Sequence, residues 1–186
     1  MREREGRDCE PSAGTVDART ARGASSVAGD TRGYDAAKKI SGRKTFGIVD
    51  TLGLLIAVAV VAASTSDNAG GIKVADAARR RLGRFRRLWC DAGFKTAFAE
   101  HCESRGVAVE VVHRVCPSRF APLPKRWIVE RTWSWLMNSR RLQIDYERDP
   151  TVTEGFIWAA HSRYLLRRLT QPAKPRTPRA NKRDSL

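Results

Sequence analysis

Apolar residues in the first part of the chain form short runs separated by turn residues, a pattern typical of strands. The runs at 46–50 and 54–61 flank Thr51-Leu52-Gly53, which is short enough to connect an antiparallel hairpin. The longest apolar run, residues 52–63, spans twelve residues. A membrane-spanning helix needs about 20, so this valine-rich run is interpreted as a buried strand.

Beyond the hairpin, helical and strand periods alternate along the chain. Ser66-Asp67-Asn68 supplies capping side chains for one helix, and Gly106 ends another. This alternation predicts one α/β domain in which a mixed sheet carries helices on its faces. The expected elements are strands at 14–17, 86–91 and 107–112, a loop at 19–44, and helices at 72–82, 95–104, around Glu130 and at 152–169.

The two ends of the chain lack the apolar pattern of the middle. Residues 1–12 are rich in charge and are predicted to be disordered. Residues 171–186 are proline-rich and basic, and are also predicted to be disordered. The folded domain is therefore expected to cover residues 13–170.

Composition narrows the partners and the compartment. A formal net charge of +15 and a pI near 10.6 point to a polyanionic partner, of which nucleic acid is the commonest. Cys9, Cys90, Cys102 and Cys116 form no CxxC pair and no regular disulfide spacing, which suits a reducing cytosol. The N-terminus has no apolar stretch typical of a signal peptide. We therefore expect a cytoplasmic, nucleoid-associated protein without a membrane partner.

Three acidic residues stand at comparable places in the predicted elements. Asp17 ends the first strand, Asp91 ends a later strand, and Glu130 lies on a helix that can pack beside them. Strand ends form the ligand-binding crevice of open α/β sheets, and carboxylates gathered there can hold Mg²⁺ ions. Simpler interpretations stay open: Asp17 and Asp91 as turn residues, and Glu130 as an ion-pair partner of Arg126 or Arg131.

Five segments in chain order give the sequence a family resemblance. They are GYDAAKK at 33–39, GRK at 42–44, VDTLGLL at 49–55, WCDAGF at 89–94 and LPKRWIVERT at 123–132. Together they resemble the catalytic portion of bacterial insertion-sequence transposases, of the DDE kind in the insertion sequence four and five superfamily. The resemblance extends from about Arg7 to Leu169, and it implies a ribonuclease H-like fold with a mixed sheet and flanking helices.

The resemblance also implies an activity and a site. Family members cut and join DNA, so we expect metal-dependent strand cleavage and strand transfer of an insertion sequence, by phosphodiester hydrolysis and transesterification. Asp17, Asp91 and Glu130 are then the catalytic acids and the ligands of two Mg²⁺ or Mn²⁺ ions. The expected partner is double-stranded DNA, both element ends and target. The basic residues expected to contact it are Lys39, Arg43, Lys44, Arg126, Arg131, Arg140 and Arg141.

The sequence departs from the family pattern in four places, one of which is the basic pair that usually follows Gly-Arg-Lys and is replaced here by Thr45 and Phe46. Asp17 is followed by Ala-Arg-Thr-Ala-Arg, where the family usually has Ser-Gln-Ser-Val-Lys. The family's tyrosine and lysine around the glutamate fall on Leu123 and Met137, whereas Arg126 keeps the intervening arginine. The family's N-terminal helical segment has no counterpart here. The chain is therefore interpreted as a truncated or split-frame copy, completed by a homodimer or by a partner frame that supplies the segment. The alternative function is an inactive remnant that only binds DNA.

Overall fold

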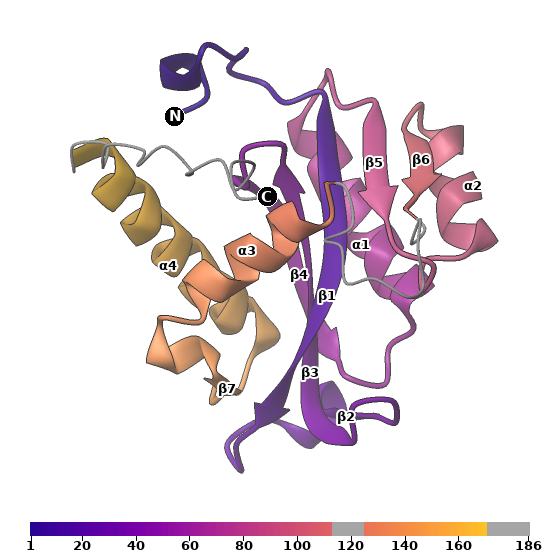
Figure 1. The fold of residues 1–186 in the computed structure, drawn as a ribbon. Coiled ribbons are helices and arrows are strands. Elements are labelled where there is room, and N and C mark those ends of the chain that lie inside the picture. The colour runs from indigo at the N-terminus through magenta and orange to yellow at the C-terminus, as the bar shows by residue number, and fades with distance from the viewer. Residues whose placement is uncertain (113–124, 171–186) are drawn as a thin grey trace, which may run out of the picture.

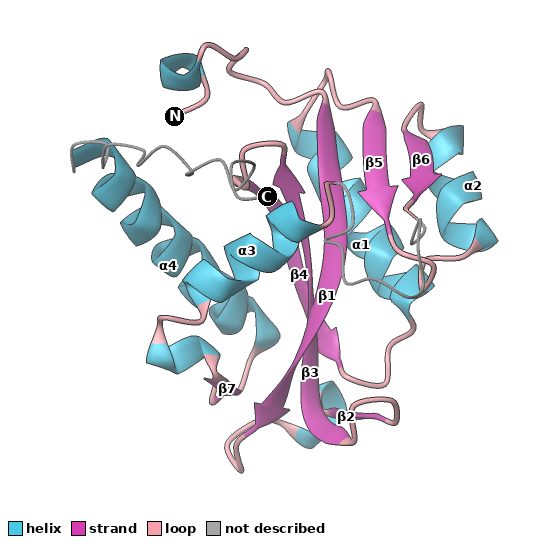
Figure 2. Cartoon of the chain, viewed as in Figure 1, coloured by secondary structure: helices cyan, strands magenta, loops and turns pink. Residues whose placement is uncertain are grey.

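One mixed β-sheet organises the protein (Figures 1 and 2). The computed structural model describes residues 1–112 and 125–170, and within these ranges seven strands join a single sheet. The strands are β1 (Ala13–Gly23), β2 (Gly33–Asp35), β3 (Ile40–Asp50), β4 (Leu55–Ala62), β5 (Arg87–Cys90), β6 (Ala108–Val111) and β7 (Ile144–Asp145). Their order is β2-β3-β1-β5-β6, with β4 paired to β3 and β7 paired to β1. The central strand β1 is antiparallel to β3 and parallel to β5.

The predicted hairpin is confirmed, whereas the predicted loop at 19–44 is wrong. Strands β3 and β4 pair antiparallel across the turn at Thr51-Leu52-Gly53. Half of the stretch at 19–44 is strand, because β1 continues past Asp17 to Gly23 and pairs with β3, β2 covers residues 33–35, and β3 begins at Ile40. Small and charged residues fill this part of β1, so its composition is typical of a loop. Its strand conformation depends on the hydrogen bonds that the distant strand β3 provides.

Helices cover both faces of the sheet. On one face, α1 and α2 pack around a core that includes Phe46 and Phe98, and on the other, α3 and α4 pack around Val60 and Trp133. Figure 1 shows these two helical layers on either side of the strands. The helices are α1 (Asp67–Arg81), α2 (Thr96–Ser104), α3 (Trp127–Leu136) and α4 (Pro150–Thr170).

Helix α1 begins at Asp67, earlier than the predicted start at residue 72. Ser66 caps it, since its Oγ accepts a hydrogen bond from the Ala69 backbone N–H at 3.2 Å. Gly70 and Gly71 weaken the helical pattern of this first turn, because glycine is a poor helix former. A Cβ atom at Gly70 would lie only 2.0 Å from the Phe46 ring. The close approach of α1 to the sheet therefore requires glycine there.

The N-terminal residues, predicted to be disordered, contact the domain in this structure. Glu3–Glu5 forms a 3₁₀ turn, and Arg2 forms an ion pair with the buried carboxylate of Asp50. Charged residues in this segment thus find partners on the domain, which composition alone does not indicate. The tail at 171–186, also predicted to be disordered, lies outside the described residues. In the described part of the chain, no helix has the length and apolar character needed to cross a membrane.

The buried His161 on α4 should make stability depend on pH. Its Nε2 accepts a hydrogen bond from the Leu55 backbone N–H at 3.1 Å, and burial lowers its pKa from 6.5 to about 4, opposed by the nearby Asp50. In the unfolded chain His161 is therefore protonated below about pH 6.5, whereas in the folded protein it is protonated only below about pH 4. Stability is lost as the pH falls through this window, by about 2 kcal/mol between pH 7 and pH 5.

Urea unfolding at these two pH values checks this expectation. The His161→Gln variant should be less stable than the wild type at pH 7, but it should lack this part of the pH dependence. Equal pH dependence in both proteins would show that His161 does not cause it.

Candidate active site

The parallel pairing of β1 with β5 brings two of the candidate acids together. The register aligns Thr15 with Trp89, and two further residues along each chain bring Asp17 level with Asp91. Asp91 directly follows β5, as predicted. Asp17 was predicted to end its strand, but it lies in the middle of β1. The reason is that β1 extends beyond the shorter β5 to pair with β3.

Arg126 connects these two acids to the third. Glu130 lies in the first turn of α3, four residues after Arg126, and its Oε1 is 3.4 Å from the Arg126 Nε. Arg126 Nη2 is 3.1 Å from Asp91 Oδ2 and 4.0 Å from Asp17 Oδ1. Carboxylates from β1, from the end of β5 and from α3 therefore converge on one guanidinium group.

Electrostatic interaction among the acids is visible at Asp17. Burial is the main cause that raises its pKa from 3.8 to about 6, and the charges of Asp91 and Glu130 raise it further. A backbone hydrogen bond from Ala18 and the charge of Arg126 act in the opposite direction. The three acids are thus close enough to repel one another, and a positive charge between them offsets that repulsion.

The chemistry of the three carboxylates suits a divalent cation, although in this structure they are arranged around the guanidinium group of Arg126. Hard oxygen anions are the ligands that Mg²⁺ prefers. Among the described residues, however, no three acidic, histidine or cysteine side chains lie close enough together to hold a metal ion as they stand. The guanidinium group occupies the position of a shared cation. The ion pair between Glu130 and Arg126, the simpler interpretation of Glu130, is present.

A fourth acid, Asp67, lies beside this group and was missed by the sequence argument. A Cβ atom placed on Gly93 would be 3.0 Å from both Asp67 Oδ2 and Asp91 Oδ1. Asp67 is the first residue of α1 and pairs with Lys44 at 3.3 Å. In the sequence it is one of several capping candidates, and only the packing of α1 against the turn after β5 reveals its position.

Arg43, expected to contact DNA, is buried and serves the fold instead. Its side chain is 1% exposed and pairs with the equally buried Asp145 at 3.3 Å. Its guanidinium also donates to the backbone carbonyls of Glu147 and Arg148 and to Thr31 Oγ1. A side chain enclosed in this way cannot reach a phosphate, so we remove Arg43 from the expected DNA contacts.

The other basic residues expected to contact DNA differ in how far contacts within the protein already occupy their side chains. Arg131 lies between the rings of Trp127 and Trp135, 4.5 Å from each centroid, and donates to the Leu52 carbonyl. Arg141 is exposed but pairs with Glu147 at 2.8 Å.

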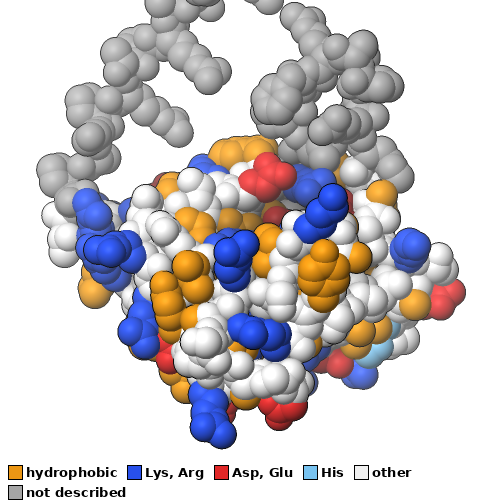
Figure 3. All heavy atoms as spheres, turned by 90° about the horizontal axis from the view of Figure 1, so that it is seen from below, with side chains coloured by type: hydrophobic (Ala, Val, Ile, Leu, Met, Phe, Trp, Pro, Cys, Tyr) orange, Lys and Arg blue, Asp and Glu red, His pale blue; other side chains and the backbone are white. Residues whose placement is uncertain are grey.

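Lys39 and Arg140 are exposed, and within the described residues neither forms an ion pair. Figure 3 shows lysine and arginine side chains spread over one face of the molecule rather than gathered in a single patch. The exposed positive charge is therefore distributed, and burial and pairing remove some members of the expected set.

Comparison with known proteins identifies the sequence family and the fold. A family model described as the transposase DDE domain matches residues 8–165. No curated protein matches the chain. A cryoEM structure of the simian T-cell lymphotropic virus intasome in complex with PP2A regulatory subunit B56 gamma is similar, with 14% sequence identity and a TM-score of 0.54. The similarity covers 97% of this chain and 62% of that chain.

A crystal structure of the catalytic core domain of BIV integrase is also similar. Its sequence identity is 14% and its TM-score 0.45, over 88% of this chain and 86% of that chain. The structural similarity to the intasome chain confirms the ribonuclease H-like fold that the sequence resemblance implied.

Proposed function

Because this chain belongs to the transposase DDE domain family, we propose that it is a DNA transposase with Asp17, Asp91 and Glu130 as its catalytic acids. The reaction is strand cleavage and strand transfer of an insertion sequence, by hydrolysis and transesterification of phosphodiesters. One observation carries the assignment of the site: the three carboxylates come from separate elements and converge on a single cation, Arg126.

In this proposal the three acids would hold two Mg²⁺ or Mn²⁺ ions. Such a pair, when bound, stabilises the entering and leaving oxygens of an in-line phosphoryl displacement. The acids supply negative charge at one point of a protein whose net charge is +15. Arg126, once it no longer neutralises them, is placed beside the site to contact a phosphate through its planar guanidinium group.

The proposed partner is double-stranded DNA, as element ends and as target. The net charge of +15 favours a polyanion, and the exposed Lys39 and Arg140 are available for phosphate contacts. A homodimer, or a partner frame that adds an N-terminal helical segment, would supply recognition of the element ends. The same charge supports association with the nucleoid, which we include in the proposal together with a cytoplasmic location.

A cleavage assay tests the proposal. The substrate is a labelled duplex that carries inverted repeats, incubated with the protein in Mg²⁺, in Mn²⁺ or in EDTA. We expect ion-dependent nicks that leave a 3′-hydroxyl, followed by strand-transfer products. Binding of the duplex without cleavage under any ion condition would contradict the proposed activity.

That negative outcome would support the second candidate, a remnant that binds DNA without cutting it. One observation favours this candidate: Arg126 already contacts all three acids and offsets part of their mutual repulsion.

Removal of Arg126 should expose the cation-binding capacity of the acids. The Arg126→Gln variant is expected to be less stable than the wild type in EDTA, because the three carboxylates then repel one another without a counter-charge. Mn²⁺ should raise its Tm more than it raises that of the wild type, since no guanidinium competes for the acids. Thermal unfolding with and without Mn²⁺ measures both effects. The exposed Arg140→Gln is the control, and an Mn²⁺ shift no larger in Arg126→Gln than in that control would contradict the expectation.

A further inference from the structure

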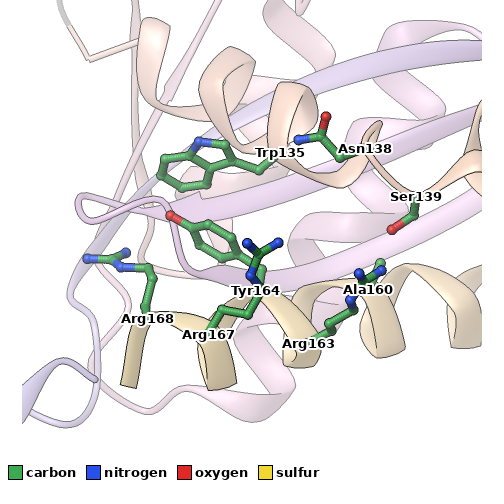
Figure 4. A pocket seen from close by; sticks show the side chains of 8 residues that line it. All are labelled: Trp135, Asn138, Ser139, Ala160, Arg163, Tyr164, Arg167 and Arg168. Atoms are coloured by element: carbon green, nitrogen blue, oxygen red, sulfur yellow. The ribbon is translucent and has the colours of Figure 1, made fainter. Parts of the chain in front are cut away.

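A groove between α3 and α4 combines positive charge with aromatic rings, away from the three acids. Its volume is about 390 Å³, and its lining includes Trp135 near the end of α3, Asn138 and Ser139 just after that helix, and Arg163, Tyr164 and Arg167 from α4. Figure 4 shows the rings of Trp135 and Tyr164 beside each other, with the arginine side chains projecting from α4. No acidic residue of the described chain lines the groove.

The arginines of the groove carry charge that the described protein does not neutralise. Arg163 and Arg167 are exposed and lie one turn apart on α4, and neither forms an ion pair within the described residues. Like charges four residues apart on one helix face repel each other and destabilise the helix. A bound polyanion would relieve this repulsion. Arg168, which also lines the groove, instead pairs with Glu5 at 3.6 Å.

Stacked rings and cations link this groove to the helix that carries the third acid. Trp135 stacks on Tyr164, with centroids 4.4 Å apart and planes 21° from parallel. Arg131 lies between Trp135 and Trp127, 4.5 Å from each. These contacts occupy ring faces, so the rings form a rigid floor rather than free platforms for bases. The groove therefore offers guanidinium groups and the polar side chains of Asn138 and Ser139, which are suited to phosphate oxygens.

The position of the groove suits the same DNA that reaches the acids. Glu130 and Trp135 are five residues apart on α3, which is about 7.5 Å along the helix axis at ~1.5 Å per residue. That length equals about two base-pair steps of ~3.4 Å. The third acid and the groove are therefore carried by one helix and are separated along it by less than a turn of duplex. Burial raises the pKa of Tyr164, opposed by the charge of Arg168 and by a hydrogen bond with its side chain.

We propose that the groove between α3 and α4 binds the phosphate backbone of duplex DNA through Arg163 and Arg167, outside the three-acid site. This inference rests on the proposed function, because it takes DNA as the partner, but it does not depend on cleavage. The groove contacts the backbone and not base edges, so it contributes affinity without sequence preference.

The test measures the binding of a labelled duplex to the full chain in EDTA. Fluorescence anisotropy gives the affinity at each of a range of salt concentrations. Arg163→Ala/Arg167→Ala should reduce the slope of log affinity against log salt by about 1.8, at ~0.9 per phosphate contact. Affinity should fall to about the same extent for unrelated duplex sequences. Arg163→Lys/Arg167→Lys keeps both charges and should keep most of the slope.

A second double variant controls for net charge. Lys73→Ala/Arg80→Ala also removes two exposed positive charges, but from α1 on the opposite face of the sheet. An unchanged slope in the groove variant, or an equal loss in the α1 variant, would overturn the inference, with circular dichroism verifying that each variant is folded. A wild-type chain that binds no DNA would overturn the proposed function and the groove together. Groove-dependent binding without cleavage would support the groove and overturn only the proposed cleavage.

Discussion

Replacement of Asp91 by asparagine is expected to slow strand cleavage by about 10³-fold or more, equal to ~4 kcal/mol of transition-state stabilisation. Asparagine keeps the Oδ1 atom that accepts a hydrogen bond from the Gly93 backbone N–H at 2.9 Å, so the turn after β5 should persist. The variant loses one of the three negative charges that would hold divalent cations, and a neutral amide is a weaker ligand for a hard ion. Cleavage of the labelled inverted-repeat duplex in Mg²⁺ or Mn²⁺ measures the effect.

Binding measurements separate a loss of chemistry from a loss of folding or of DNA contact. In EDTA, Asp91→Asn should bind the duplex at least as tightly as the wild type, since it removes a negative charge beside the DNA. Asp30→Asn is the matched control, because Asp30 is exposed in the 3₁₀ turn Gly29–Thr31, and it should cleave normally. Wild-type cleavage rates in Asp91→Asn would disprove a catalytic role. A parallel loss of binding and cleavage would place the defect in folding or DNA contact.

The sequence predicted local elements better than the pairings between distant ones. The hairpin around Thr51-Leu52-Gly53 was predictable because its apolar runs and its turn are contiguous in sequence. The second half of β1 was not, because Arg19–Gly23 has little apolar character and is a strand only through its pairing with β3. Helix α1 was predicted too short because glycines disrupt its pattern where the helix packs tightly on Phe46.

In the candidate site, too, the individual residues could be nominated from the sequence, whereas the contacts between distant segments could not be predicted. The order and family context of Asp17, Asp91 and Glu130 nominated them, but their proximity depends on the parallel register of β1 and β5 and on the packing of α3. Sequence reasoning offered Arg126 as a partner of Glu130 and as a DNA contact. The structure adds that the same guanidinium also meets Asp17 and Asp91, which arise from distant segments of the chain.

Arg43 illustrates why the basic residues were the hardest to assign. In the segment Gly42-Arg43-Lys44 the two cations are equivalent by composition, yet Arg43 is buried in the structure while Lys44 is only partly covered. The difference lies in Asp145, which is far along the chain and reaches Arg43 through the short strand β7 beside β1. No local pattern around residue 43 indicates such a partner.

The Arg43→Ala variant is therefore expected to lose about 3–5 kcal/mol of unfolding free energy, as expected when one partner of a buried ion pair is removed. The substitution leaves the Asp145 carboxylate buried with two remaining donors, the Glu147 backbone N–H at 3.0 Å and Thr153 Oγ1 at 2.9 Å. It also leaves the carbonyls of Glu147 and Arg148 without the guanidinium that they accept from. Urea unfolding measures the loss, and Arg140→Ala, an exposed arginine, should change stability by no more than about 0.5 kcal/mol.

A double-mutant cycle distinguishes this structural role from contact with DNA. If the cost arises from an unpaired charge, Asp145→Asn should offset part of it, and the double variant should be more stable than the sum of the two single losses predicts. Arg43→Lys should restore only part of the stability, because an ammonium group cannot donate in the geometry of the guanidinium fork. Arg43→Ala protein that remains folded should also bind duplex with the wild-type salt slope. A reduced slope at unchanged stability would instead return Arg43 to the DNA surface and contradict its burial against Asp145.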